Sequence, residues 1–284
     1  MDKKKKKRSR KIIHEEIDKI EMFSSQEEWV DFLTTKGNNH RHYYHYTTIN
    51  TLKAILASGH WKLKRADLSN DSNECPVYNT SFTTSSLSSM GMWGMYSKLS
   101  STDDIGVRID IPKKTFKGIF SKNATWYTRN SEGIFQPFAK ATPQITDVAY
   151  WHFGKTKNSS LAIYKSYQLP GPALNFHFSK DQQLPPQFKN AIWRKEEEVR
   201  VFYDFSNFCN VHDSLYVKIK PEHFKNMKFR ISPAISNYKN IPFLQSQDNE
   251  EDCLQFIVNE ILEKKLDIEQ FTLPTQYEKW QSNF

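Results

Sequence analysis

The sequence predicts an α+β fold, with central antiparallel or mixed β-sheets flanked by N- and C-terminal helices. Three observations lead to this prediction. Candidate strands concentrate in the middle of the 284 residues, candidate helices lie toward both ends, and the two kinds of element do not alternate strictly. A doubly wound parallel sheet would require strict alternation, so the segregated pattern favours the α+β class.

The first elements of the chain are predicted to be helices. Ile13, Ile17 and Ile20 recur at helical spacing within 12–23. Residues 24–28 then offer an N-cap serine and early acidic residues for a short amphipathic helix.

A strand–helix–strand unit is expected next. Residues 42–47 are aromatic and β-prone, which predicts a strand. In 48–58, isoleucine and leucine recur at helical spacing, and Gly59 suits the left-handed position that ends a helix. A short strand over 61–64 completes the unit.

The middle of the chain carries further candidate strands. Residues 77–84 and 105–111 alternate between apolar and polar side chains, and Pro112 closes the second run. Residues 87–99 are compatible with a helix. Weaker candidates are strands over 118–127 and 144–152 and a lid-like, proline-rich connection over 169–186.

The last third of the chain gives the strongest elements. Strands are expected over 199–205, 214–219 and 227–231, and a helical turn with proline at N1 over 221–224. Residues 248–266 form the clearest helix, because acidic residues crowd its first turn and apolar residues share one face. That face comprises Cys253, Leu254, Ile257, Ile261 and Leu262.

Four segments are expected along the chain. Residues 1–11 are predicted to be a disordered basic arm, 12–40 N-terminal helices, 41–245 the main α+β domain, and 246–284 a C-terminal helix and tail. The net charge is +8, and much of it lies in the arm. Residues 3–11 are therefore a candidate contact for nucleic acid, and the alternative is a solubilising tail.

Composition also bears on the compartment. No run of about 18 apolar residues exists to cross a membrane, and the start lacks the apolar stretch of a secretory signal. Cys75, Cys209 and Cys253 are widely spaced and form no CxxC pair. Sparse cysteines indicate a reducing compartment and argue against a disulfide framework or a structural zinc site. We therefore expect a cytoplasmic protein without a membrane partner or a metal.

The first candidate site is the strand segment that holds His45 and Thr47. Alternate residues of a strand project from one face. An imidazole and a hydroxyl on that face can hold a ribose hydroxyl and a polar ring. The alternative is a partly buried structural histidine.

The second candidate site is an acidic and basic run near the start of a late strand. If that strand begins near Glu196, then Glu196, Glu198 and Arg200 share one face. A carboxylate beside an arginine is held ionised. The alternative is a solvated face with an ion pair, although the run leads into a strongly hydrophobic strand.

Two weaker groups of residues accompany these sites. Asn70, Asp71 and Glu74 lie in a polar loop, where simple turn chemistry is the alternative. Trp93 and Tyr96 are three residues apart, so on a helix they share a face and can flank a planar ring. A methionine and aromatic stripe of this kind also suits a core.

An ordered set of short motifs runs through residues 42–240. It comprises Tyr44-His45-Tyr46-Thr47, Ile55-Leu56-Ala57-Ser58-Gly59, Ser69-Asn70-Asp71-Ser72-Asn73-Glu74, Ser81-Phe82-Thr83, Met92-Trp93-Gly94-Met95-Tyr96, Gly106-Val107-Arg108-Ile109-Asp110, Trp193-x-x-Glu196-x-Glu198-x-Arg200 and Ile231-Ser232-Pro233. In this order the motifs resemble the bacterial domain of unknown function 2971 family. Two positions depart from the family pattern. Ser72 replaces a proline, and 100–104 replace a histidine-containing turn.

More distantly, the chain resembles the ADP-ribosyltransferase fold. That resemblance implies that His45 and Thr47 grip NAD, that Tyr96 or Trp93 stacks on its base, that Glu198 stabilises the positively charged ribose, and that Glu196 positions the acceptor. The implied catalytic residues are Glu198, Glu196 and His45. The implied NAD-binding residues are His45, Tyr46, Thr47, Ser81, Thr83, Trp93, Tyr96 and Arg200.

The resemblance implies an NAD-dependent ADP-ribosyltransferase-like enzyme, a toxin or anti-phage effector acting on a protein or nucleic acid. NAD is then a substrate, and no metal is expected. One alternative is a metal-dependent nuclease in which Asp71, Glu74, Glu196 and Glu198 bind a hard cation and the basic arm grips nucleic acid. Another is a non-catalytic sensor or interaction module whose charged face is structural.

Overall fold

The computed structural model describes residues 26–66, 77–85, 90–96, 104–121, 124–152, 161–164, 167–170, 185–204 and 212–275. The expected helix over 12–23, the basic arm and the loop residues Asn70, Asp71 and Glu74 lie outside these residues. So do residues 171–184 of the proline-rich connection.

The first half of the chain contributes both helices and strands. In order they are α2 (Gln26–Gly37), β1 (His42–Thr48), α3 (Ile49–Ser58), β2 (His60–Arg65), β3 (Val77–Thr83), α4 (Met90–Tyr96), β4 (Gly106–Pro112), α5 (Lys113–Ile119), β5 (Ala124–Arg129) and β6 (Phe135–Ala141).

The second half contributes shorter strands and several short helices. In order they are β7 (Gln144–Asp147), β8 (Ala149–His152), β9 (Leu161–Tyr164), β10 (Tyr167–Pro170), β11 (Phe188–Asn190), the 3₁₀ helix η4 (Ala191–Glu196), β12 (Glu198–Asp204), β13 (Ser214–Lys218), α6 (Pro221–Phe224), β14 (Lys228–Ile231), the 3₁₀ helix η5 (Pro233–Asn240), α7 (Glu250–Phe256), the π-helical turn η6 (Ile257–Ile261), the 3₁₀ turn η7 (Ile268–Gln270) and β15 (Phe271–Thr272).

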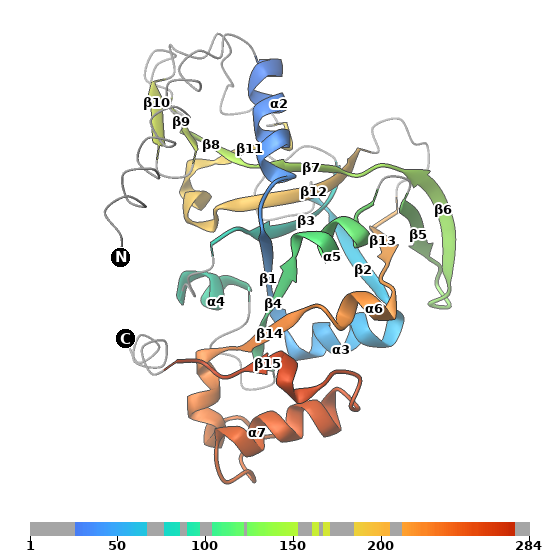
Figure 1. Ribbon diagram of the computed structural model, residues 1–284, viewed down its shortest axis with the longest axis vertical. Helices are drawn as coiled ribbons and strands as arrows, with labels where there is room; N and C mark the ends of the chain where they lie inside the picture. The colour runs from blue at the N-terminus through green and yellow to red at the C-terminus, as the bar shows by residue number, and fades with distance from the viewer. Residues whose placement is uncertain are drawn as a thin grey trace.

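The predicted α+β class is confirmed, since the fold combines a large mixed sheet with several helices (Figure 1). Within the described residues the main sheet has 11 strands, in the order β15-β14-β4-β1-β3-β2-β13-β5-β6, with β12 joining β3 to β7. A second sheet of four strands has the order β10-β9-β8-β11. None of the helices in the described part of the chain combines the length and apolar character needed to cross a membrane.

The strand β3 organises the main sheet because three strands pair with it. Along one side, β12 pairs with it from Glu198 opposite Thr83 to Asp204 opposite Val77. Along the other side, β1 pairs only at Thr83 and β2 only at Tyr78 and Asn79. Since β1 and β2 leave β3 at opposite ends, its central residues face an opening between these two strands.

The unit β1–α3–β2 has the predicted order. Thr48 caps α3 by accepting a hydrogen bond from the Thr51 N–H, and Gly59 ends it in the left-handed region at φ 65°. The apolar face of α3 joins the main core, which also includes Trp61 and Phe82. Cys253 and Leu254 of α7 belong to the same core, so the C-terminal helix packs into the body of the main sheet.

Three expected elements are wrong in part. The range 118–127 is not all strand, because the buried Phe116 and Ile119 keep α5 helical to Ile119. The range 144–152 is two strands in different sheets, divided at Val148, whose N–H donates to the Glu198 carbonyl. The helix expected over 248–266 ends earlier, at η6, because Glu263 and Lys264 both have positive φ.

Gly37 allows α2 to approach the backbone of β7. A Cβ at Gly37 would lie 2.5 Å from the Thr146 carbonyl carbon and 2.6 Å from the Asp147 nitrogen. We expect Gly37→Ala to lower the free energy of unfolding by about 1–3 kcal/mol through overpacking, measured by urea denaturation. Gly94→Ala is the control, because a Cβ there meets nothing within 4 Å. It should be neutral or stabilise by about 0.5–1 kcal/mol, and equal destabilisation of both variants would contradict this account.

Candidate functional site

A cavity of about 800 Å³ lies in the opening between β1 and β2. Its lining residues come mainly from β1, α3, β2, β3, α4, the end of η4 and the start of β12. The predicted site residues that line it are His45, Tyr46, Thr47, Ser81, Thr83, Tyr96, Glu196 and Glu198. The structure therefore brings together side chains from segments that are far apart in the sequence.

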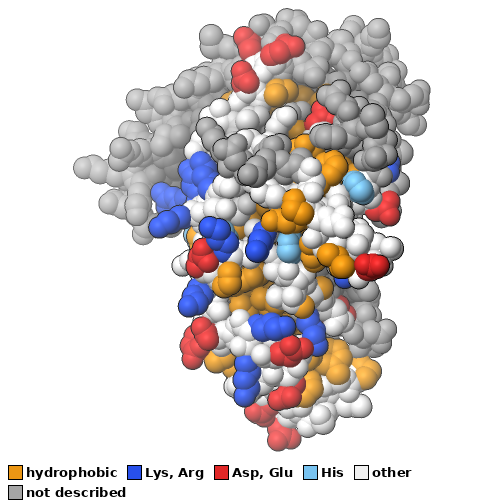
Figure 2. Space-filling view, turned by 90° about the vertical axis from the view of Figure 1, so that its right-hand side faces the viewer, with side chains coloured by type: hydrophobic (Ala, Val, Ile, Leu, Met, Phe, Trp, Pro, Cys, Tyr) orange, Lys and Arg blue, Asp and Glu red, His pale blue; other side chains and the backbone are white. Residues whose placement is uncertain are grey.

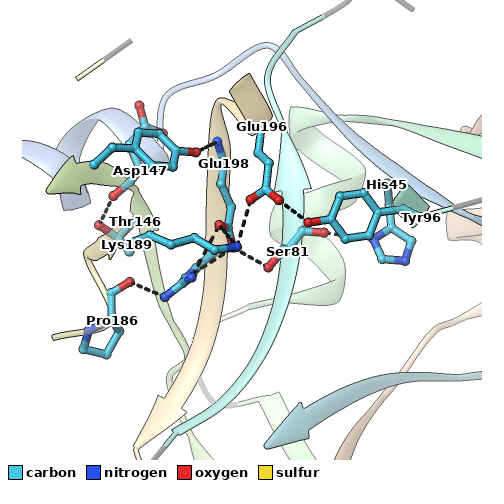
Figure 3. Close-up of polar contacts among 11 residues, drawn as sticks. His45, Ser81, Tyr96, Thr146, Asp147, Pro186, Lys189, Glu196 and Glu198 are labelled. Atoms are coloured by element: carbon cyan, nitrogen blue, oxygen red, sulfur yellow. Dashed lines mark hydrogen bonds and ion pairs between the residues drawn. The ribbon is translucent and has the colours of Figure 1, made fainter. Parts of the chain in front are cut away.

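Two buried carboxylates lie at one end of this cavity, joined by one lysine. The Lys189 ammonium lies 2.8 Å from Glu196 Oε2 and 3.2 Å from Glu198 Oε2 (Figure 3). Arg200 Nε donates to Glu198 Oε1 at 2.8 Å. The hydroxyl of Ser81 also donates to Glu198. Two anions and two cations are thus buried together with no net charge.

The backbone between the carboxylates has an uncommon conformation. Glu197 has φ 44° and ψ 51°, in the left-handed region that is costly for a residue with a Cβ. The expectation of a strand that includes Glu196 is wrong, since Glu196 ends the 3₁₀ helix η4 and β12 begins at Glu198. The left-handed residue between helix and strand lets both carboxylates reach Lys189.

The two carboxylates differ in how their charge is stabilised. Burial alone would raise the pKa of Glu198, but the Arg200 guanidinium and the Lys189 ammonium outweigh it and hold this pKa well below its usual range. Burial, together with the charge of Glu198, raises the pKa of Glu196. Glu198 is therefore the fixed anion of the pair, and Glu196 is the carboxylate better able to accept a proton.

His45 is a neutral imidazole with a defined tautomer. Burial lowers its pKa to about 4, and its ring packs against Trp61 and Phe82. Its Nδ1 lies 2.9 Å from the carbonyl oxygen of Ser81. Ser81 lies in the central part of β3, which neither β1 nor β2 pairs with. A carbonyl can only accept, so Nδ1 carries the proton. Nε2 is left as an acceptor, suited to a ligand hydroxyl.

The low pKa of His45 predicts a loss of stability in acid. The unfolded chain binds a proton at His45 near pH 6.5 and the folded chain only near pH 4, so protonation between these values favours unfolding. We expect the free energy of unfolding to fall as the pH is lowered from 6.5 to 4, and His45→Gln to flatten this dependence. Parallel pH profiles from urea titrations of both proteins would contradict the assignment.

The aromatic residues of α4 have different positions. Tyr96 lines the cavity, is 40% exposed, and donates its hydroxyl hydrogen to Glu196. Trp93 is fully buried and packs edge-on against Tyr46, with ring centroids 4.7 Å apart. The expectation that Trp93 flanks a ligand ring is therefore wrong. The helix directs Trp93 into the core below the cavity and leaves Tyr96 at its rim.

Arg200 also has a role different from the one expected. It is 1% exposed and does not line the cavity. Its guanidinium is held by Glu198 and by the Pro186 carbonyl, 3.2 Å from Nη1. Arg200 thus positions Glu198 instead of contacting a ligand directly. Thr47 and Thr83 are buried side chains on the cavity wall.

Sequence reasoning missed the residues that complete the carboxylate cluster. Lys189 comes from β11, which was not expected as a strand, and its ammonium lies 5.2 Å from the ring centre of Trp193. Burial alone would lower the pKa of Lys189, but Glu198 and Glu196 outweigh it and raise this pKa. Tyr150 accepts a hydrogen bond from the Glu198 N–H at 3.0 Å. Both residues belong to strands of the small sheet. No local motif marks either of them, because they meet the carboxylates only through the packing of that sheet against η4 and β12.

The carboxylates Glu196 and Glu198 are also the proposed metal ligands in the alternative of a metal-dependent nuclease. Among the described residues, no group of three or more His, Cys, Asp or Glu side chains is arranged to hold a metal. The Lys189 ammonium bridges Glu196 and Glu198, which is the position a shared divalent cation would occupy.

Searches of family models, curated proteins and solved structures found no match to this chain. The case for a function depends on the geometry of the cavity.

Proposed function

We propose that this protein is an NAD-dependent ADP-ribosyltransferase-like enzyme that modifies a macromolecule. The observation that carries the proposal is that His45, Tyr96 and Glu198, from three distant segments, line one cavity. A volume of about 800 Å³ is within the range of natural ligand sites. The resemblance to a bacterial family and to the transferase fold supports a role as a toxin or anti-phage effector.

The reaction breaks the bond between the nicotinamide nitrogen and C1′ of the ribose. The bonding electron pair leaves with nicotinamide and cancels the positive charge of its ring, so positive charge develops on the sugar. Glu198 is the group to stabilise this charge, because it is ionised and fixed by Ser81, Arg200 and Lys189. A charge that is already oriented needs no reorganisation in the transition state.

The acceptor forms the new bond to C1′ and gives up a proton. Glu196 is suited to receive that proton, because its pKa is raised above that of an ordinary carboxylate. The Tyr96 hydroxyl and the Lys189 ammonium hold Glu196 in place. The half-exposed Tyr96 ring lies at the rim, where it can stack on the nicotinamide.

The part of the cavity wall that β1 forms can hold the ribose. His45 offers Nε2 as an acceptor for a ribose hydroxyl, and Ser81 fixes the imidazole through its carbonyl. Thr47 lies two residues along β1 and supplies a second hydroxyl. These contacts orient C1′ relative to Glu198, which is the geometric requirement for the reaction.

The test is incubation of the purified protein with cell extract and NAD that carries a radiolabel in the adenylate phosphate. We expect label on a protein or nucleic acid of the extract and release of free nicotinamide. The label should persist after denaturation, since it is covalently attached. Absence of both label transfer and nicotinamide release, under conditions in which a known transferase is active, would overturn the proposal.

A further inference from the structure

A second hollow lies next to the first, on the other side of β2. Its volume is about 730 Å³, and it is lined by polar side chains of β13 and of the β5–β6 turn. The strand order β3-β2-β13-β5 places β2 between the two hollows. Lys62 lines both of them, so they meet over this strand.

The register of the sheet places two lysines on the face that carries both hollows. Lys64 pairs with Asn79 of β3 on one side and with Ser214 of β13 on the other. Lys62 pairs with Tyr216. Directly paired residues point to the same face of a sheet, and Lys62 and Lys64 are two residues apart. Both ammonium groups therefore rise from the strand that separates the hollows.

These two lysines are charged groups without a neutralising partner in the part of the chain that the structure describes. Lys189 and Arg200, at the other end of the first cavity, are engaged by carboxylates. Lys62 and Lys64 are exposed and form neither a hydrogen bond nor an ion pair with a described residue. The first cavity thus has a neutralised carboxylate end and a cationic end. A third carboxylate on its wall, Asp104, accepts hydrogen bonds from the backbone N–H groups of Asn50 and Ile105.

The surface around the two hollows carries charged side chains of both signs. Figure 2 views the molecule from the side on which β5 and β6 lie in Figure 1. Side chains of both signs are exposed there, and several lysine and arginine side chains lie close together at the left of the view. Within the second hollow itself, Arg129 is accompanied by Glu132 and Asp213. Within the two hollows, Lys62 and Lys64 add two exposed positive charges at β2.

We propose that Lys62 and Lys64 bind the diphosphate of a dinucleotide, whose one ribose lies at Glu198 and whose other nucleoside lies in the second hollow. The inference builds on the proposed function and adds the orientation of the substrate. Two ammonium groups on flexible stems can converge on the oxygens of one diphosphate. Asn79, which pairs with Lys64, offers a neutral hydrogen-bond donor on the same face of the sheet.

The test compares ligands that share different parts of the dinucleotide. NAD, ADP, inorganic pyrophosphate and nicotinamide riboside are titrated into the full-length protein by calorimetry. We expect Lys62→Ala/Lys64→Ala to weaken the binding of NAD, ADP and pyrophosphate by about 10–100-fold, the effect of losing charge-assisted hydrogen bonds. Nicotinamide riboside, which lacks phosphate, should bind equally to both proteins. Lys117→Ala/Lys225→Ala removes the same charge from exposed sites outside both hollows and is the matched control.

A second variant tests the second hollow. Ser131 is an exposed turn residue on its wall, so Ser131→Trp adds bulk there without disturbing the core. We expect it to weaken the binding of NAD and ADP but not of pyrophosphate. Unchanged ADP affinity in Ser131→Trp would overturn the placement of the nucleoside.

The outcomes separate this inference from the proposed function. If pyrophosphate and ADP bind through the two lysines but NAD is never cleaved, the phosphate site stands and the transferase proposal fails. If NAD is cleaved and the double variant binds it as the wild type does, the phosphate site is refuted and the transferase proposal stands. Failure of the wild type to bind NAD, ADP and pyrophosphate refutes both.

Discussion

The Glu198→Gln variant is expected to release nicotinamide from NAD about 10²–10³-fold more slowly than the wild type. The amide keeps the shape of the side chain and can still accept the Ser81 hydroxyl hydrogen, but it removes the negative charge beside the ribose. The measurement is the rate of nicotinamide release at saturating NAD, so that a change of affinity does not contribute.

The control for this prediction is Asp147→Asn. Asp147 is a buried carboxylate that pairs with His40 at 2.6 Å, and it does not line the cavity. This substitution also removes a buried anion from its partner, so it reports the general effect of that loss on activity. Wild-type nicotinamide release by Glu198→Gln would show that the charge of Glu198 does not act in the reaction and that the charged cluster is structural.

The Lys189→Met variant is expected to lose about 3–5 kcal/mol of unfolding free energy, the usual effect of breaking a buried ion pair. Arg200 would still neutralise Glu198, but Glu196 would lose its cation and keep only the hydrogen bond from the Tyr96 hydroxyl. The measurement is urea denaturation at neutral pH. Lys113→Met is the control, because Lys113 makes an exposed contact with Asn39, and its loss should change stability by at most about 0.5 kcal/mol.

The pH dependence of Lys189→Met identifies the carboxylate that loses its partner. The pKa of Glu196 is already raised in the folded protein, so the folded state binds a proton more readily than the unfolded state as the pH falls. The variant should therefore recover stability on mild acidification. The double variant Lys189→Met/Glu196→Gln should recover most of it at neutral pH, because it is again neutral. A double variant no more stable than the single one would refute the assigned pairing.

Local sequence patterns predicted the elements that frame the cavity. The order of β1, α3 and Gly59 follows from aromatic β-propensity, helical spacing and a left-handed stop, which all act over a few residues. Alternation predicted β3 and β4 for the same reason. The strands β9 and β11 were not predicted, because they have only four and three residues, too few to show a pattern. The strand β6 was not predicted either, because Pro137 interrupts its pattern.

The candidate site was predictable as residue types but not as a network. His45, Tyr96 and Glu198 are marked by motifs that resemble a family, and they line one cavity. Lys189 has no such mark, because its relation to the carboxylates exists only once β11 lies beside η4. The prediction of a strand at Glu196 was wrong for a related reason. The left-handed backbone at Glu197 is imposed by the surroundings and goes against the preference of glutamate.

The candidate site can be completed only late in synthesis. The strand β3 pairs with β1 only at Thr83, whereas it pairs with β12 along its whole length. His45 leaves the ribosome about 150 residues before Glu198, an interval of about 8–30 s at about 5–20 residues per second. Until β12 joins β3, the nascent chain has the imidazole wall without the carboxylates. If the protein is the transferase that we propose, a product terminated before β12 would lack both carboxylates and would be unable to cleave NAD.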